Sequence, residues 1–148
     1  MIGIFFILGA VSVIMAPTST QTTNTQNVAD VQNVKETQTN SELTNTISGK
    51  LGKDEKLQDV TTKDREIDLK IDLGNETNGL TLEDLACTRY AGITDYLLST
   101  GEWDTITADF VNVGKITMDA SESTSTEILG EKKKYFPLEI ITKKFEKY

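Results

Sequence analysis

The sequence predicts a small α+β domain with an antiparallel sheet, in the order β–α–β–β–α, behind an apolar N-terminal segment and a polar linker. Three patterns carry this prediction. Apolar and charged residues alternate over Glu66–Leu73, apolar residues recur every three or four positions over Leu82–Ser99, and further alternation follows at residues 105–120. All three lie in the single domain predicted at residues 64–148, which is enough chain for one modest hydrophobic core.

The N-terminal segment, Met1–Ala16, contains no charged side chain. As a helix it would be about 24 Å long, which is shorter than the hydrocarbon layer of about 30 Å and makes a full membrane span marginal. A signal peptide has an apolar region of this length, but the basic residues that normally precede it are missing. We expect a membrane-targeting segment, either a cleaved signal peptide or a retained anchor; a buried core strand is the remaining alternative.

Residues 17–63 are predicted to form a flexible linker. In Pro17–Ser48, 21 of the 32 residues are Thr, Ser, Asn or Gln, and none is aromatic. This stretch therefore has too little apolar surface to offset the entropy lost on ordering it. The next stretch, Gly49–Lys63, stays polar and leads into the domain. A chain that begins near Leu51 is accordingly expected to keep its fold.

The first predicted strand, Glu66–Leu73, places four apolar residues on one face and four charged residues on the other, as a half-buried strand does. A turn over residues 74–79 follows. Thr81 and Asp84 then form an approximate capping box ahead of a helix from about Leu82 to Ser99, and Gly101 supplies the stop.

Two further strands are predicted at residues 105–110 and 115–120, joined by a tight turn that contains Gly114. Residues 121–134 are predicted to be a loop. For residues 135–148, Pro137 suits the first position of a helix, and Glu139 lies four residues before Lys143, so a helix is favoured. An edge strand beginning near Pro137 is the alternative, because apolar residues also alternate there.

Charge divides the domain into an acidic body and a basic tail. Residues 49–130 hold 17 Asp and Glu against 8 Lys and Arg, a net charge of −9, whereas residues 131–148 hold 6 Lys against 3 Glu, a net charge of +3. The run Lys132–Lys134 is either a solvated face or a contact with an anionic surface. Nucleic acid is not an expected partner, since the whole chain has a net charge of −8.

The composition excludes the commonest catalytic machinery. Without histidine, the chain lacks Ser-His-Asp and Cys-His catalysis and His-ligated zinc. Its one cysteine, Cys87, lies in the predicted helix beside Ala86, which indicates a small buried thiol. No glycine-rich phosphate-binding motif is present. We therefore assign no catalytic, cofactor-binding or metal-binding residue.

Two groups of acidic residues resemble cation ligands only in part. Four carboxylates share one face of the first strand: Asp64, Glu66, Asp68 and Asp72. Lys70 lies among them, which favours the wet face of a sheet over a metal site. The window Asp72–Glu83 has an acid at each end, as a calcium loop does, but Thr77 replaces the glycine that such a loop needs.

These observations together predict an exported, membrane-tethered or secreted module that binds a protein or another surface of the cell envelope without catalysing a reaction. The apolar segment at residues 1–16 predicts an extracytoplasmic location. A prokaryotic cell envelope is favoured, because an exported domain with a single cysteine has no intrachain disulfide and must rely on hydrophobic packing alone. A structural subunit of a cell-surface assembly or filament is the alternative. An enzyme that uses carboxylates or a metal is the least supported class.

Overall fold

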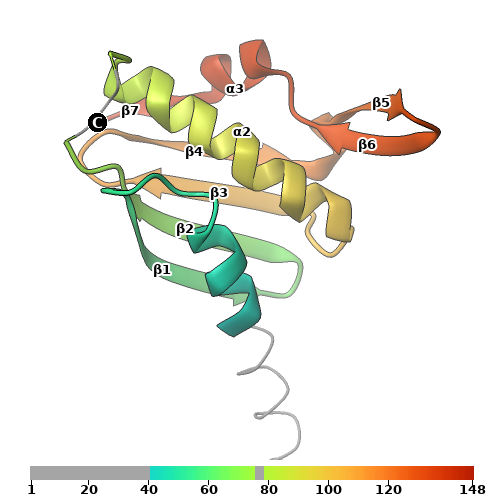
Figure 1. The fold of residues 1–148 in the computed structure, drawn as a ribbon, viewed down its shortest axis with the longest axis horizontal. Helices are drawn as coiled ribbons and strands as arrows, with labels where there is room; N and C mark the ends of the chain where they lie inside the picture. The colour runs from blue at the N-terminus through green and yellow to red at the C-terminus, as the bar shows by residue number, and fades with distance from the viewer. Residues whose placement is uncertain (1–40, 76–78) are drawn as a thin grey trace, which may run out of the picture.

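The computed structural model describes residues 41–75 and 79–148, and within them the predicted α+β class is confirmed (Figure 1). A helix at residues 41–48 comes first. The remaining elements are β1 (Lys56–Lys63), β2 (Glu66–Asp72), α2 (Leu82–Thr100), β3 (Thr105–Phe110), β4 (Gly114–Asp119), the 3-10 turn η1 (Ala120–Glu122), β5 (Thr124–Ile128), β6 (Glu131–Tyr135), α3 (Leu138–Lys144) and β7 (Glu146–Lys147).

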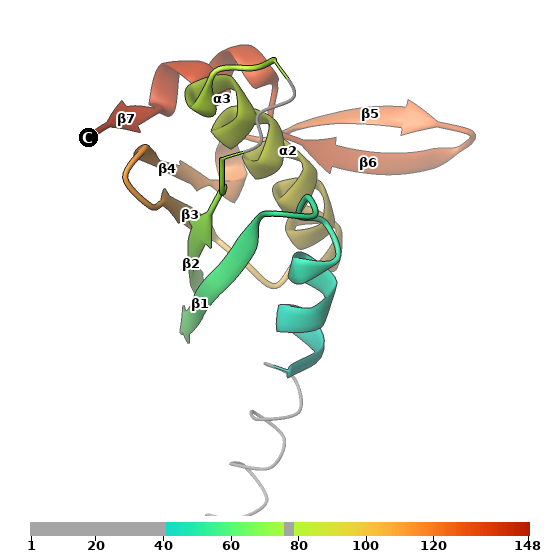
Figure 2. The ribbon, with the colours of Figure 1, turned by 60° about the vertical axis from the view of Figure 1, so that its left-hand side comes forward.

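The main sheet has the strand order β1-β2-β3-β4-β7, and the helices lie on one of its faces (Figure 2). The prediction of a purely antiparallel sheet is wrong, because β2 and β3 pair in parallel, with Ile67 beside Ile106 and Ile71 beside Phe110. The reason is the connection between them. The chain leaves β2, passes through α2 and returns at the other end of the sheet, and such a helical crossover brings the next strand in parallel.

Helix α2 has nearly the bounds that the sequence predicts. The Thr81 side chain accepts a hydrogen bond from the Asp84 backbone N–H at the start, and Gly101 ends the helix in the left-handed conformation, with φ of 69°. Its buried face packs on the sheet through residues of apolar or weakly polar type: Leu85, Ala86, Cys87, Tyr90, Ile93, Thr94, Leu97 and Leu98.

The expectation that residues 17–63 form a flexible linker is wrong for the part that the structure describes. Leu43 and Ile47 lie one helical turn apart in the helix at residues 41–48, and both are buried in the main core. Glu55, in the connection to β1, accepts hydrogen bonds from the Arg89 side chain of α2 (Nε to Oε2, 2.6 Å) and from the Gly52 N–H (2.9 Å). β1 then pairs with β2. The fold therefore begins before Asp64.

Two other sequence-based expectations fall outside the described residues, namely the membrane-targeting segment at residues 1–16 and the linker at residues 17–40; the predicted turn at residues 74–79 falls there in part. Among the helices formed by residues 41–75 and 79–148, none is long and apolar enough to cross a membrane.

The C-terminal third differs most from expectation. Residues 121–134, predicted as a loop, contain most of a hairpin in which β5 and β6 pair antiparallel, apart from the main sheet. The sequence conceals it because neither strand alternates between buried and exposed positions. For the tail, the favoured helix exists as α3, whose Ile141 is buried. A two-residue edge strand, β7, follows α3. It lies nearer the C-terminus than the edge strand that the alternative placed near Pro137.

Candidate functional site

The β5–β6 hairpin projects from the body of the molecule, and Figure 2 shows it extending away from both the sheet and the helices. Every residue of its two strands is exposed except Thr126, which is half-buried. A two-stranded ribbon without a covering layer is at best marginally stable in water. An exposed ribbon of this kind therefore needs firm support at its base.

That support comes from residues at both ends of the hairpin. Phe136, directly after β6, is buried and stacks on Tyr90 of α2, with the ring centroids 6.2 Å apart. Two residues before β5, Glu122 accepts a hydrogen bond from Lys144 of α3 (Nζ to Oε1, 2.7 Å), which lowers the pKa of the Glu122 carboxyl. Burial raises the pKa of Tyr90, whose hydroxyl donates to the Ile106 carbonyl at 2.7 Å. The hairpin is thus fixed at its base and free at its end.

The turn of the hairpin carries apolar side chains where a polar residue or glycine would suit the backbone better. Leu129 and Gly130 both have positive φ, 54° and 82°. A two-residue turn of this kind favours Asn-Gly, because asparagine and glycine tolerate the left-handed region and leucine does not. Leu129 is nevertheless fully exposed, at 101%, and Ile128 beside it is 48% exposed. We call Ile128 and Leu129 the hairpin tip.

Behind the hairpin tip, β6 carries the lysine run that the sequence singles out. Lys132 lies opposite Glu127 on β5, whereas Lys133 and Lys134 lie opposite Thr126 and Ser125. The ion pairs found among the described residues include none of these three lysines. Their charges are therefore available to an approaching partner.

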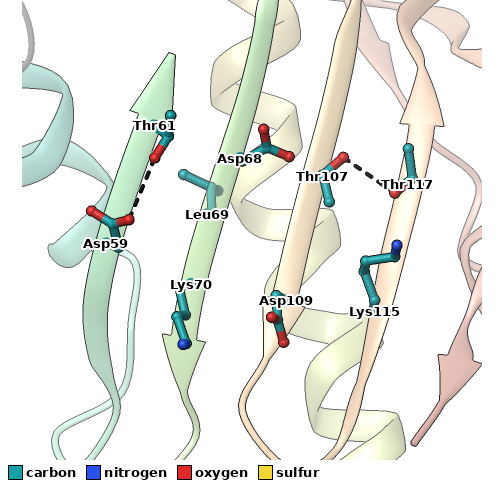
Figure 3. Close-up of a pocket in the computed structure, with 9 residues that line it drawn as sticks. All are labelled: Asp59, Thr61, Asp68, Leu69, Lys70, Thr107, Asp109, Lys115 and Thr117. Atoms are coloured by element: carbon teal, nitrogen blue, oxygen red, sulfur yellow. Dashed lines mark hydrogen bonds between the residues drawn. The ribbon is translucent and has the colours of Figure 1, made fainter. Parts of the chain in front are cut away.

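The second candidate surface is the face of the main sheet that the helices leave uncovered. Figure 3 shows its polar side chains standing side by side across four strands. The strand register places unlike charges next to one another along one row: Asp59, Lys70, Asp109 and Lys115. The neighbouring row is mostly threonine, with Thr107 and Thr117 joined by a hydrogen bond of 3.1 Å. Unlike charges on neighbouring strands stabilise strand pairing. The charges of this face are therefore accounted for by the sheet itself.

The acidic residues considered as cation ligands do not meet at one point. Asp64 lies in the β1–β2 turn with φ of 53°, and the exposed side chains of Glu66 and Asp68 follow along β2. Asp72 accepts hydrogen bonds from the Gly74 N–H (2.9 Å) and from the Gln58 side chain (3.3 Å). In the parts of the chain that the structure describes, no three His, Cys, Asp or Glu residues are placed to hold a metal ion.

Cys87 lies on the core side of α2 and is 3% exposed. Burial raises the pKa of its thiol, and a hydrogen bond with Thr142 opposes that shift only in part. A thiol that stays protonated and inaccessible is a poor nucleophile. Cys87 is thus part of the packing, as its neighbours in the sequence indicate.

Comparisons of the chain with protein-family models, with curated proteins and with solved structures found no match. The candidate site therefore rests on the geometry of this chain alone. Sequence reasoning singled out the lysine run but missed the hairpin that presents it. The available signal was Gly130, which suits a tight turn, preceded by the β-branched residues Thr124, Thr126 and Ile128 at every second position.

Proposed function

We propose that the protein is a non-catalytic interaction module, exported and either secreted or held at the membrane, that binds a protein or another surface of the cell envelope through the β5–β6 hairpin. The observation that carries the proposal is Leu129: a fully exposed leucine, in a backbone conformation that leucine disfavours, at the end of a hairpin whose base is fixed.

The physical argument compares the free and bound states of the hairpin tip. In the free protein, the Leu129 side chain gains nothing from packing and is less suited to the turn than asparagine. Burying such a side chain against a partner contributes about 1.5–3 kcal/mol. The lysines behind it add attraction to an acidic partner and speed its encounter. A binding role accounts for both features, whereas a purely structural turn accounts for neither.

The proposed location rests on the uncharged segment at residues 1–16 and the polar stretch after it. A reporter enzyme that is active only outside the cytoplasm, fused after residue 40, tests this location. We expect activity in the wild-type fusion and its loss when Lys replaces Phe6 and Leu8, since each charge costs about 2.5–3.5 kcal/mol near the centre of an inserting segment. Activity confined to a cytoplasmic reporter would contradict export.

The binding role is tested by photo-cross-linking the full chain in its native envelope, with the photoreactive residue at Glu127 on the hairpin. We expect defined cross-linked products that weaken at high salt. Replacing Lys132, Lys133 and Lys134 by Gln should reduce their yield and its salt dependence, and Leu129→Asn should reduce it about tenfold or more, the factor for a loss of 1.4 kcal/mol.

Two controls keep this test sharp. The matched triple variant of exposed lysines elsewhere, Lys53, Lys56 and Lys63 to Gln, removes the same charge and should leave the yield unchanged. A photoreactive residue at Asp68, on the uncovered face of the sheet, should give few products. Equal yields from the two triple variants would show that the lysine run is only a solvated face.

A further inference from the structure

We infer that one partner of the hairpin is a second copy of this chain, whose groove at the start of α2 receives the hairpin tip, so that copies associate head to tail. This inference rests on the proposed function, because it names the partner of the same hairpin. It also defines a specific contact for the alternative role, which is that of a structural subunit of an assembly.

The groove lies where the first turn of α2, the β3–β4 turn and the C-terminal residues come together. Its volume is about 270 Å³, and its lining combines the apolar residues Leu82, Val113 and Tyr148 with the polar residues Thr81, Glu83, Asn112 and Lys147. Leu82 is 40% and Tyr148 67% exposed, so apolar surface faces solvent here as it does at the hairpin tip. The three apolar residues therefore offer contacts to an entering apolar side chain.

Hydrogen bonds hold the groove in shape before any partner arrives. The Tyr148 hydroxyl donates to Asp109 at 2.9 Å, which raises the pKa of the Tyr148 phenol, and the Tyr148 N–H donates to the Val113 carbonyl at 3.4 Å. An ion pair adds to these hydrogen bonds, because Lys147 Nζ lies 3.6 Å from Glu83 Oε2. Because the walls are tied to the fold, binding would require little ordering, which favours affinity.

The sizes agree. An apolar cavity of roughly 150 Å³ accommodates a benzene molecule. A groove of about 270 Å³ therefore has room for the Leu129 side chain together with part of Ile128. The tip also lies at the free end of the projecting hairpin, so it can reach the groove before the two molecular bodies meet (Figure 2).

The charges favour this protein surface over an anionic membrane. Glu127, Glu131 and Lys132 flank the hairpin tip, so both signs of charge lie beside it. The groove likewise presents Glu83 beside Lys147, and each acid can approach a lysine of the other copy. An anionic bilayer would attract the lysines, but it would repel both carboxylates and the rest of the acidic domain.

Geometry makes the contact intermolecular. Figures 1 and 2 both show the hairpin at one side of the molecule and β7, with the C-terminus, at the other. The hairpin of one molecule cannot reach its own groove, so the contact joins two different surfaces. Such a heterologous interface repeats from copy to copy, giving a filament, or a ring if the rotation closes.

The first test is cross-linking of the full chain, solubilised in detergent, with a short bis-maleimide. Cys87 is the only natural cysteine and is buried, so engineered cysteines dominate the reaction. Differently tagged Glu127→Cys and Leu80→Cys variants, placed beside the hairpin tip and beside the groove, should form a mixed dimer when combined. Glu127→Cys combined with Asp68→Cys, on the uncovered sheet face, should not. Equal yields from the two combinations would overturn the inference.

The second test uses complementary variants and light scattering on the same solubilised protein. Wild-type protein should form oligomers that grow with concentration, and Leu129→Asp and Leu82→Glu should each remain monomeric. Their equimolar mixture should form a dimer and nothing larger, because one intact tip and one intact groove remain. Thr117→Glu, which adds the same charge to an exposed position elsewhere, should assemble like wild type.

The outcomes separate this inference from the proposed function. Monomeric wild-type protein at every concentration, with no mixed dimer, would overturn the head-to-tail contact. If the Glu127 photo-cross-links to other envelope components then persist and still depend on Leu129, the proposed function stands with a different partner. Binding to phosphatidylglycerol vesicles that Leu129→Asp weakens, in the absence of oligomers, would show that the tip enters a bilayer instead.

Discussion

Two pairs of apolar residues, Leu43 with Ile47 and Ile128 with Leu129, have opposite environments in this protein. Ile47 is 0% exposed in the hydrophobic core, whereas Leu129 is 101% exposed at the end of the hairpin. Both pairs come from stretches that the sequence presents as polar connections. The comparison shows that similar-looking stretches have different structural roles: the first buries its apolar residues in the hydrophobic core, and the second leaves its apolar residues exposed at the end of a hairpin.

The largest expected effect tests the buried side of this comparison. A chain that begins at Leu51 lacks Leu43 and Ile47, and removal of one large buried aliphatic side chain costs about 2–5 kcal/mol. Since a domain is stable by about 5–15 kcal/mol, this chain should lose its cooperative unfolding, measured by circular dichroism during urea denaturation. A chain that begins at Ser41 is the control. Equal transitions for both would show that the helix at residues 41–48 does not contribute to the core.

The next effect concerns the ion pair that fastens the connection between that helix and β1. The Glu55 side chain is 4% and the Arg89 side chain 27% exposed. Arg89→Ala leaves the Glu55 carboxylate buried without a cation, which should cost about 3 kcal/mol. Arg65→Ala removes a pair with Asp104 whose side chains are 55% and 65% exposed, so the loss of stability should be much smaller than for Arg89→Ala. Guanidinium denaturation compares the two; similar losses would contradict the burial argument.

A smaller effect concerns the pH dependence of the stability that Glu122 contributes at the base of the hairpin. The hydrogen bond from Lys144 holds the pKa of Glu122 below its ordinary value of 4.5. A carboxyl with a lowered pKa stabilises the folded state above pH 4.5, and this contribution is lost as the pH falls through the folded-state pKa. Glu122→Gln should therefore reduce the difference between the Tm values at neutral and acidic pH, whereas Glu139→Gln on α3 should not. Unchanged pH profiles would show that the pair contributes no stability.

The smallest expected effect on stability tests the exposed side of the comparison. Leu129→Asn places the favoured residue at a position of positive φ, so the free energy of unfolding should stay within about 0.5 kcal/mol of wild type or rise slightly. The same variant should reduce the cross-links of the hairpin about tenfold or more. A marked fall in Tm would show that Leu129 serves the fold and would remove the reason to assign it to binding.

The sequence by itself determined the elements whose signals are local. The bounds of α2 follow from Thr81, the three-to-four-residue apolar spacing and Gly101, and β2 follows from its alternation of buried and exposed residues. The absence of histidine-based chemistry and the division into acidic body and basic tail are likewise properties of the chain. These features depend on neighbours a few residues away, so no tertiary contact is needed to recognise them.

Only the tertiary structure decided which segments join the core and which stay exposed. The parallel pairing of β2 with β3 depends on the path of α2 across the sheet. The burial of Leu43 and Ile47 depends on a surface supplied by α2 and the sheet, while Ile128 and Leu129 meet no such surface within the described chain. Burial is a non-local property, and two apolar residues within a polar stretch carry no local signal of whether the folded chain will cover them.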